Sequence, residues 1–273
     1  MSTQSHKPLS IALLGASGRM GREVLALLPG NTGFELSGAG CSPEGGLLAQ
    51  PVSLLQKGLP DLRFDGNPSK AVAGASVAID FSLPDATASH LDACREQGVP
   101  LVLCATGHDA AQLDAIRELS KTVPVLLAAN TSLGVTLLNR LVEIAASTLG
   151  EQFDTEIFEV HHRNKRDLPS GTALKLGEAV ARGRKAALAE LAENRIPGSQ
   201  QLRSPGSIGF SAVRAGDVAG EHTVLFAADG ERLELVHKVS KRSTFAQGAL
   251  KAAQWLADQP PGLYEMSDVL GLN

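Results

Sequence analysis

Short apolar runs alternate with longer amphipathic segments over the first half of the chain. The apolar runs predict buried strands at residues 9–14, 34–39, 77–81, 100–104 and 124–129. Between them, apolar residues recur every three or four positions, which predicts helices at 18–28, 84–97 and 109–121. Strands separated by helices of this length are typical of βαβ units. We therefore expect an α/β fold with a parallel sheet in this half.

The pattern changes after residue 130. A long amphipathic helix is predicted at 133–149, a strand at 153–162 and a second long helix at 172–194. Three closely spaced strands follow at 208–214, 221–228 and 231–239, with Asp229-Gly230 as the hairpin turn between the last two. This spacing indicates a mixed or antiparallel sheet. The sequence thus predicts a Rossmann-like domain over residues 1–130, a smaller α+β domain over 131–240 and a terminal helix at 243–257.

Composition narrows the class of protein. The 273 residues are 43% hydrophobic, which is enough for a sizeable core, and the net charge of −4 argues against general nucleic-acid binding. The three cysteines have no C-x-x-C spacing, so we expect neither a metal site nor disulfides. The polar N-terminus has no signal-peptide core, and no apolar run approaches the roughly 20 residues that span a bilayer. We expect a soluble, cytoplasmic protein without a membrane partner.

A glycine-rich turn follows the first predicted strand and opens the first helix. It reads Gly15-Ala16-Ser17-Gly18-Arg19-Met20-Gly21, and glycines in this context let the backbone approach a pyrophosphate at a helix N-terminus. The spacing departs from G-x-G-x-x-G because Ala16 replaces the first glycine, so a βα turn without a ligand is the alternative. Where an NAD-preferring domain carries an acidic residue, this chain has Cys41-Ser42. The pattern therefore admits either NADH or NADPH.

A cationic tract lies in the second half. His161, His162 and Lys165 stand within a few residues of one another, in company with two arginines. On a strand His161 would share a face with Glu159, while His162 would face the other way, so both reach one ligand only if the strand ends there. Histidine can donate a proton near neutral pH, and lysine can polarise an imine. The tract suits a small polyanionic substrate, and the alternative is a solvated basic loop.

The turn Pro169-Ser170-Gly171-Thr172 follows the cationic tract directly. Ser170 or Thr172 can cap the next helix, and the backbone N–H groups at its start can hold a carboxylate. An ordinary helix cap is the alternative. The convergence of histidines, a lysine and a helix N-terminus favours a functional site.

With these motifs located, the chain resembles the dihydrodipicolinate reductase family. That family's signature E-x-H-H-x-x-K-x-D-x-P-S-G-T-A is present from Glu159 to Ala173. The glycine turn and three shorter segments also match, namely Ala128-Ala129-Asn130, Val213 to Asp217 and Gly220 to Thr223. The similarity extends from about residue 9 to the C-terminus.

The resemblance implies NAD(P)H-dependent reduction of 4-hydroxy-tetrahydrodipicolinate to tetrahydrodipicolinate with loss of water, in diaminopimelate and lysine biosynthesis. It implies His161 as the proton donor with Lys165 as its catalytic partner. The cyclic dicarboxylate would be held by His162, Lys165, Ser170, Gly171 and Thr172. The cofactor would be held by Gly15, Ala16, Ser17, Gly18, Arg19, Met20, Gly21, Ser42, Cys104, Ala105, Thr106, Ala128, Ala129, Asn130 and Thr131. The resemblance also implies a homotetramer built through the second sheet, with residues 241–273 packing back on the nucleotide domain.

Several positions differ from familiar members of that family, and all of them lie on the cofactor side. The chain has Cys104-Ala105-Thr106-Gly107 for Gly-Thr-Thr-Gly, Thr131 for a frequent Phe, Leu83 for a frequent Arg, and Cys41-Ser42 for a Glu-Arg pair. These differences keep open an NAD(P)H-binding regulatory protein without turnover. A semialdehyde-type dehydrogenase with Cys104 as nucleophile is a third possibility, although no Cys-His pairing is visible for it.

Overall fold

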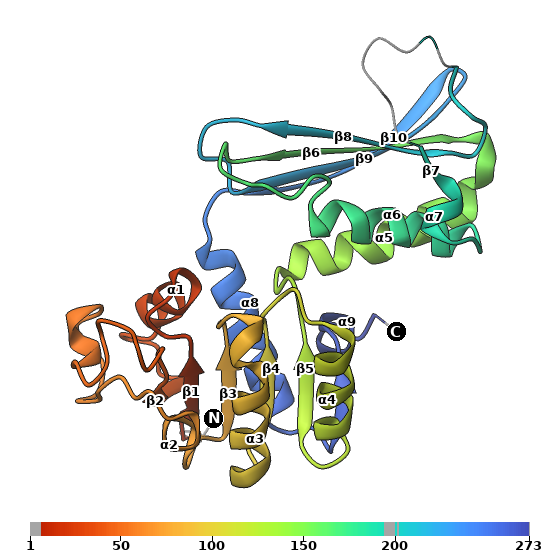
Figure 1. Cartoon of the computed structure of the whole chain (residues 1–273). Helices are drawn as coiled ribbons and strands as arrows, with labels where there is room; N and C mark the ends of the chain where they lie inside the picture. The colour runs from red at the N-terminus through yellow and green to blue at the C-terminus, as the bar shows by residue number, and fades with distance from the viewer. Residues whose placement is uncertain (1–6, 194–199, 201, 273) are drawn as a thin grey trace, which may run out of the picture. The chain divides into compact units, whose positions relative to one another are not determined.

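The computed structural model describes residues 7–193, 200 and 202–272, and these form two compact units. The first unit comprises the described residues up to Ser132 together with Arg242–Gly271, and the second comprises Leu133–Lys241 and Leu272. The sequence placed the domain boundaries at residues 130/131 and 240/241. Figure 1 shows the elements of each unit.

A six-stranded parallel sheet forms the centre of the first unit, in the order β11-β5-β4-β3-β1-β2. Its strands are β1 (Leu9–Leu14), β2 (Phe34–Ala39), β3 (Val77–Asp80), β4 (Leu101–Leu103), β5 (Pro124–Leu127) and β11 (Gly262–Tyr264). Its helices are α1 (Arg19–Leu27), α2 (Pro68–Val72), α3 (Thr87–Gln97), α4 (Ala110–Ser120), α8 (Ser243–Leu256) and α9 (Met266–Val269). The sequence prediction of a parallel α/β sheet is confirmed.

The C-terminal segment completes this sheet. Strand β11 pairs in parallel with β5, and the apolar pattern did not reveal either β11 or α9. Helix α8 approaches the chain after β5 so closely that a Cβ on Gly248 would lie 1.7 Å from the carbonyl oxygen of Thr131. Only a glycine fits at that contact, and α8 is thereby held in the first unit.

A mixed five-stranded sheet forms the second unit, in the order β10-β9-β6-β8-β7. Its elements are α5 (Leu133–Leu149), β6 (Asp154–His161), α6 (Gly171–Gly183), α7 (Leu188–Leu191), β7 (Ala192–Glu193), β8 (Ile208–Arg214), β9 (Gly220–Ala228) and β10 (Glu231–Val239). Strand β6 is parallel to β8 and antiparallel to β9. Helices α5 and α6 cover one face of the sheet, where Ile157, Val224 and Phe226 are fully buried (Figure 1). The prediction of a mixed sheet is confirmed.

The single long helix predicted over 172–194 is wrong. Helix α6 ends at Gly183, and α7 and β7 follow before residue 194, which lies outside the described residues. The left-handed backbone of Lys185, with φ of 58°, turns the chain out of the helix. A Cβ on Gly183 would lie 2.6 Å from the carbonyl oxygen of Glu143 in α5, so the two helices meet at this point. Helix packing, which the local alanine-rich pattern does not encode, sets the end of α6.

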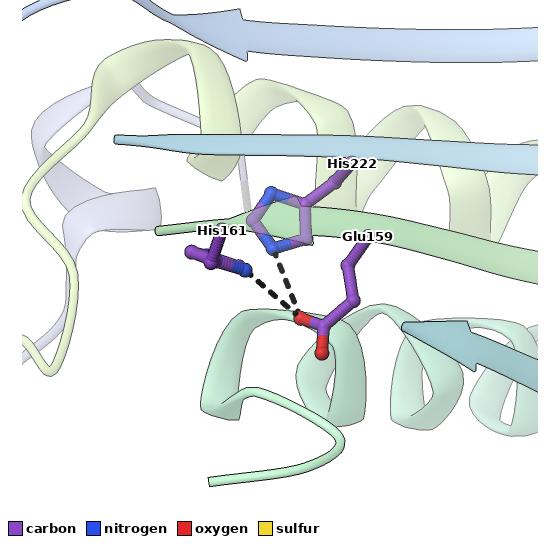
Figure 2. A group of neighbouring side chains, drawn as sticks. All are labelled: Glu159, His161 and His222. Carbon is purple, nitrogen blue, oxygen red and sulfur yellow. Dashed lines mark ion pairs between the residues drawn. The ribbon is translucent and has the colours of Figure 1, made fainter. Parts of the chain in front are cut away.

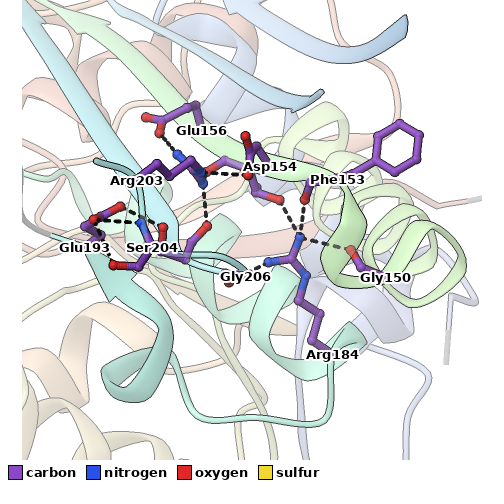
Figure 3. A network of polar contacts seen from close by, with 11 residues as sticks. Gly150, Phe153, Asp154, Glu156, Arg184, Glu193, Arg203, Ser204 and Gly206 are labelled. Atoms are coloured by element: carbon purple, nitrogen blue, oxygen red, sulfur yellow. Dashed lines mark hydrogen bonds and ion pairs between the residues drawn. The ribbon is translucent and has the colours of Figure 1, made fainter. Parts of the chain in front are cut away.

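Two half-buried arginines fasten the loop before β8 to the start of β6 (Figure 3). Arg184 donates to the carbonyl oxygens of Gly150, Phe153 and Gly206 and to Oγ1 of Thr155, at 2.8–3.2 Å. Arg203 donates to the carbonyl oxygens of Thr155 and Ser207 and pairs with Glu156 and Asp154. These bonds hold one end of the sheet, away from the site described below.

Candidate active site

The glycine turn of the first unit has a backbone that tolerates no side chains at two of its positions. Gly15 has φ of +71°, and a Cβ there would lie 2.8 Å from the backbone of Phe81 and Ser82. A Cβ on Gly21 would lie 2.4 Å from the carbonyl oxygen of Gly15. The turn therefore packs against the loop after β3, and α1 packs on the turn.

The N-terminus of α1 has the character of an anion site. Its N-cap is Gly18, and among the described residues no side chain caps it. The first turn contains Arg19 in place of an acidic residue, and Arg22 Nε donates to the carbonyl oxygen of Ser17 at 2.9 Å. The partial positive charge of the helix end is thus left for a ligand, which fits the pyrophosphate of a dinucleotide.

The parallel sheet brings the other predicted cofactor residues to the same edge. Ser42 follows β2, the segment 104–106 follows β4 and the segment 128–131 follows β5, so all lie beyond the carboxyl ends of strands of the same parallel sheet. This edge is where open α/β sheets bind their ligands. Thr131 is buried, and its hydroxyl donates to the carbonyl oxygen of Phe245 at 2.6 Å. This hydrogen bond attaches the chain after β5 to α8.

Cys104 does not have the properties of a nucleophile. Its side chain is buried, and burial, together with the carboxylate of Asp80, raises its pKa well above the usual value. A thiol with a raised pKa is protonated at neutral pH and attacks carbonyls poorly. The geometry therefore gives no support to the semialdehyde-type dehydrogenase.

An acidic residue that the sequence pattern did not indicate lies beside the end of β2. Asp65 forms a bridge with Gly40, and its carbonyl oxygen accepts from the Cys41 N–H at 2.9 Å. Burial and the Asp65 carboxylate raise the pKa of Cys41. An acidic residue from a segment distant in sequence thus lies beside Cys41-Ser42, and its Oδ1 accepts from the N–H of Asn67 at 2.8 Å.

In the second unit, strand β6 presents its functional side chains on the buried face. Ile157, Glu159 and His161 alternate with more exposed residues and are buried, and the strand ends at His161. His162 follows the strand end and is half-buried. The predicted shared face of Glu159 and His161, and the predicted break of the strand near His162, are confirmed.

Glu159, His161 and His222 form a buried cluster (Figure 2). Oε2 of Glu159 lies 3.4 Å from Nδ1 of His161 and 3.8 Å from Nε2 of His222, and Figure 2 shows both imidazoles directed to that oxygen. The two rings meet edge to face with centroids 5.0 Å apart. Strand pairing produces this contact, because Glu159 of β6 lies opposite His222 of β9.

The second oxygen of Glu159 is held by two donors. Oε1 accepts from the N–H of Ser170 at 3.0 Å and from Nη2 of Arg214 at 2.8 Å. Burial alone would raise the pKa of Glu159, but the contacts from His161, Ser170 and Arg214 outweigh it and hold that pKa well below its usual range. Glu159 is therefore a carboxylate at neutral pH.

His222 is held neutral by its surroundings. Burial, followed by repulsion from His161, lowers its pKa to about 4, although the charge of Glu159 acts in the opposite direction. Its Nε2 lies 3.3 Å from the hydroxyl of Ser170. A neutral His222 therefore links the strand to the N-terminus of α6.

The remaining predicted substrate residues lie along the turn that leads into α6. Ser170 is the N-cap, and its hydroxyl accepts from the Ala173 N–H at 3.2 Å, while Gly171 and Thr172 begin the helix. Ser170 is buried, so its N–H and hydroxyl serve Glu159, His222 and the helix. Gly171 is exposed. The capping prediction is confirmed, and Gly171, the first residue of the helix, forms a backbone hydrogen bond with Asp167.

Lys165 forms an ion pair with Asp167, with Nζ 2.9 Å from Oδ2. Burial raises the pKa of Asp167, but the hydrogen bond and charge of Lys165 prevail and lower it. Lys165 also contributes to the lowered pKa of His222, which places its ammonium near the cluster. The structure thus brings Lys165, His161 and the start of α6 to one end of the sheet.

The cluster also offers a set of donors for a metal ion. One ligand atom each from Glu159, His161 and His222 lies within 4.8 Å of the others. However, the guanidinium of Arg214 already balances the charge of Glu159 and would repel a second cation. The residues suit the orientation of a proton donor better than a cation site.

The sequence pattern indicates no role for His222, Arg214 or Glu159, although each lies within a segment that matches the family. One signal was available for His222, which alternates with the buried Val224 and Phe226 and is a polar residue on an inward face. Arg214 had no such signal, because it reaches Glu159 only through the pairing of β8 with β6.

Comparison with known proteins shows what the whole chain is similar to. The family model "Dihydrodipicolinate reductase, N-terminus" matches residues 9–131, and "Dihydrodipicolinate reductase, C-terminus" matches residues 134–270. A 4-hydroxy-tetrahydrodipicolinate reductase of Halorhodospira halophila is 46% identical over 97% of this chain and 99% of its own length. That of Thiobacillus denitrificans is 45% identical over 96% and 98%. A dipicolinate-bound dihydrodipicolinate reductase from Paenisporosarcina has the same fold, with a TM-score of 0.74 and 23% identity over 94% of this chain and 97% of its own.

Proposed function

The chain belongs to the dihydrodipicolinate reductase family, and we propose that it is a nicotinamide-dependent oxidoreductase that reduces 4-hydroxy-tetrahydrodipicolinate to tetrahydrodipicolinate. The reaction adds one hydride and one proton to the substrate and releases water. It serves diaminopimelate and lysine biosynthesis. The observation that carries the proposal is the buried cluster of Glu159, His161 and His222 beside the N-terminus of α6.

The substrate is a ring with two carboxylates, and the end of the second sheet has the matching charges. We assign Lys165, His162 and the N-terminal residues Gly171 and Thr172 to hold the carboxylates, since cations and the positive end of a helix dipole favour anions. Ser170 contributes by capping α6 and fixing its start.

His161 is the proposed proton donor. Its Nδ1 faces the Glu159 carboxylate, so the ring can become an imidazolium without leaving an unpaired buried charge. The ammonium of Lys165 stabilises negative charge that develops on the ring. General acid catalysis of this kind typically contributes about 10²–10⁴-fold in rate.

The cofactor edge of the first unit fits a nicotinamide dinucleotide. The close packing at Gly15 and Gly21 and the N-terminus of α1 suit the pyrophosphate. When bound, the cofactor supplies the hydride. We propose that both NADH and NADPH are accepted, because Cys41-Ser42 provide neither an acidic side chain to select the ribose hydroxyls of NADH nor an arginine to select the 2′-phosphate of NADPH.

We further propose a homotetramer that forms through the sheet of the second unit. The face opposite α5 and α6 carries exposed apolar side chains on three strands, with Phe158 41%, Val213 51% and Val236 49% exposed. Strand register places all three on that face. Sedimentation of a monomer at micromolar concentration would contradict this assembly.

A cytoplasmic location is also proposed, since Cys41, Cys94 and Cys104 are all free thiols. Within the described ranges, no helix combines the length and the apolar character that crossing a membrane requires.

The test follows the absorbance of NADH and NADPH in parallel, with substrate freshly made by the preceding enzyme. We expect both cofactors to be consumed. The variant His161→Ala/Lys165→Ala should lose turnover and keep cofactor binding, which is measured by fluorescence titration. Cofactor binding without consumption by the native protein would favour the regulatory alternative, and near-native rates in the double variant would refute the assigned residues.

A further inference from the structure

The two ring nitrogens of His161 have different surroundings. Nδ1 is buried and lies 3.4 Å from Oε2 of Glu159. Nε2 is on the opposite side of the ring, where it lies 3.2 Å from the position that a Cβ on Gly220 would occupy. Because Nδ1 is enclosed against the carboxylate, only Nε2 can exchange a proton with a ligand.

The carboxylate that faces Nδ1 is held rigidly. Glu159 is 1% exposed, and its Oε1 is fixed by the N–H of Ser170 and the guanidinium of Arg214. These donors come from the turn before α6 and from β8, so Glu159 cannot rotate away without breaking contacts to two other elements. Its free oxygen, Oε2, is thereby aimed at the histidine rings.

We propose that Glu159 is a positioning residue for the proton donor. Its carboxylate keeps a proton on Nδ1 of His161 and holds the ring so that Nε2 carries the transferable proton. The inference rests on the proposed function, because it takes His161 as the donor. In a neutral imidazole one nitrogen bears the hydrogen, and the hydrogen-bond partner of the other nitrogen selects which.

Gly220 lies beside Nε2 of His161, the nitrogen proposed to donate the proton. Its backbone is not in the left-handed region, so conformation does not require a glycine there. A methyl group would meet Nε2 at 3.2 Å and Cδ2 at 3.4 Å of the His161 ring. The missing side chain leaves room at the nitrogen that donates.

Charged and titratable groups face His161 from every neighbouring strand. Glu159 lies on β6 itself, Arg214 on β8 and His222 on β9, and His237 of β10 is paired in register with His222. Lys165 contributes from the loop after β6. Glu159 is the anion among them that contacts the ring, so its removal leaves the imidazolium among positive and neutral groups.

The test compares Glu159→Gln with Glu156→Gln, a matched control on the same strand. Glu156 also pairs with an arginine, Arg203, but belongs to the other end of the sheet. We expect Glu159→Gln to lower kcat about 10–100-fold, as loss of an orienting partner does, and to change KM less than about 3-fold. The alkaline limb of its pH–rate profile should move to lower pH. Glu156→Gln should keep the native kcat and profile.

A second readout does not depend on turnover. Nuclear magnetic resonance of protein labelled with ¹⁵N-histidine reports which ring nitrogen of His161 carries hydrogen. We expect the Nδ1–H form in the native protein and loss of that preference in Glu159→Gln. Gly220→Ala should retain the Nδ1–H form and still lose kcat about 10-fold, because the methyl group displaces Nε2 from the ligand.

These outcomes separate the two proposals. An inactive native protein would refute the proposed function, while the resonance measurement would still decide the role of Glu159. A neutral Nε2–H form in the native protein would overturn the positioning role. A native kcat in both Glu159→Gln and Gly220→Ala would also overturn the positioning role. If Glu159→Gln does not fold, the resonances of His161 in the native protein and the kcat of Gly220→Ala still test the positioning role of Glu159.

Discussion

Arg214 should be a major source of stability in the second unit, because it pairs with a buried carboxylate. The Glu159 side chain is 1% exposed and that of Arg214 17%, with Nη2 2.8 Å from Oε1. Arg214→Met would leave Glu159 charged and deprived of its cation. Breaking a buried pair in this way typically costs about 3–5 kcal/mol. The Ser170 N–H remains as a donor, so we expect a loss near the lower end, about 3 kcal/mol.

A double-mutant cycle isolates the interaction. Glu159→Gln keeps an acceptor for Ser170 and should cost about 2 kcal/mol by itself. The double variant Glu159→Gln/Arg214→Met leaves no buried charge unpaired, and we expect it to lose only about 2 kcal/mol. The coupling energy would then be about 3 kcal/mol. Urea unfolding followed by far-ultraviolet circular dichroism at pH 7 measures all four proteins.

The pH dependence gives a second constraint on the same pair. The folded pKa of Glu159 is lowered from its usual 4.5, so its contribution to stability is complete above that pH and is lost as the pH falls further. The deficit of Arg214→Met relative to the native protein should therefore shrink below pH 4.5. Losses in the double variant equal to the sum of the single losses would refute the reasoning.

Three further predictions concern other parts of the chain. In Gly21→Ala the methyl group would meet the Gly15 carbonyl oxygen at 2.4 Å, so NADPH affinity should fall at least about 10-fold in fluorescence titration. His222 has a folded pKa of about 4 against the usual 6.5, so native stability should decline by up to about 3 kcal/mol between pH 6.5 and 4, and His222→Gln should flatten that decline in urea unfolding. Arg184→Met removes four hydrogen bonds to buried acceptors and should destabilise the protein by about 3 kcal/mol in the same assay.

Each of these has a matched control or a contrary outcome. Gly46→Ala places its methyl group in open space and should leave NADPH affinity unchanged. Arg182→Met removes an exposed neighbour of Arg184 and should cost less than about 1 kcal/mol. An unchanged pH dependence in His222→Gln would mean that this residue is not the buried neutral histidine.

Local pattern accounts for most of the secondary structure. Alternation along β6 was enough to place Glu159 and His161 on one face, and the glycine turn after β1 was recognisable from its position between strand and helix. These features depend on residues that are near one another in the sequence. The same holds for Ser170 as the cap of α6, because capping involves only the next three residues.

Features that depend on contacts between distant segments were not accessible from the chain alone. The end of α6 is set by packing against α5, and β11 is a short strand that acquires its partner only when the C-terminus reaches β5. The contacts of Glu159 with His222 and Arg214 likewise arise from strand pairing across more than fifty residues. The residue types along the chain indicate the candidate chemistry, but strand register determines which side chains are in contact. The free energy of strand pairing is spread over many backbone hydrogen bonds, and no local sequence motif predicts it.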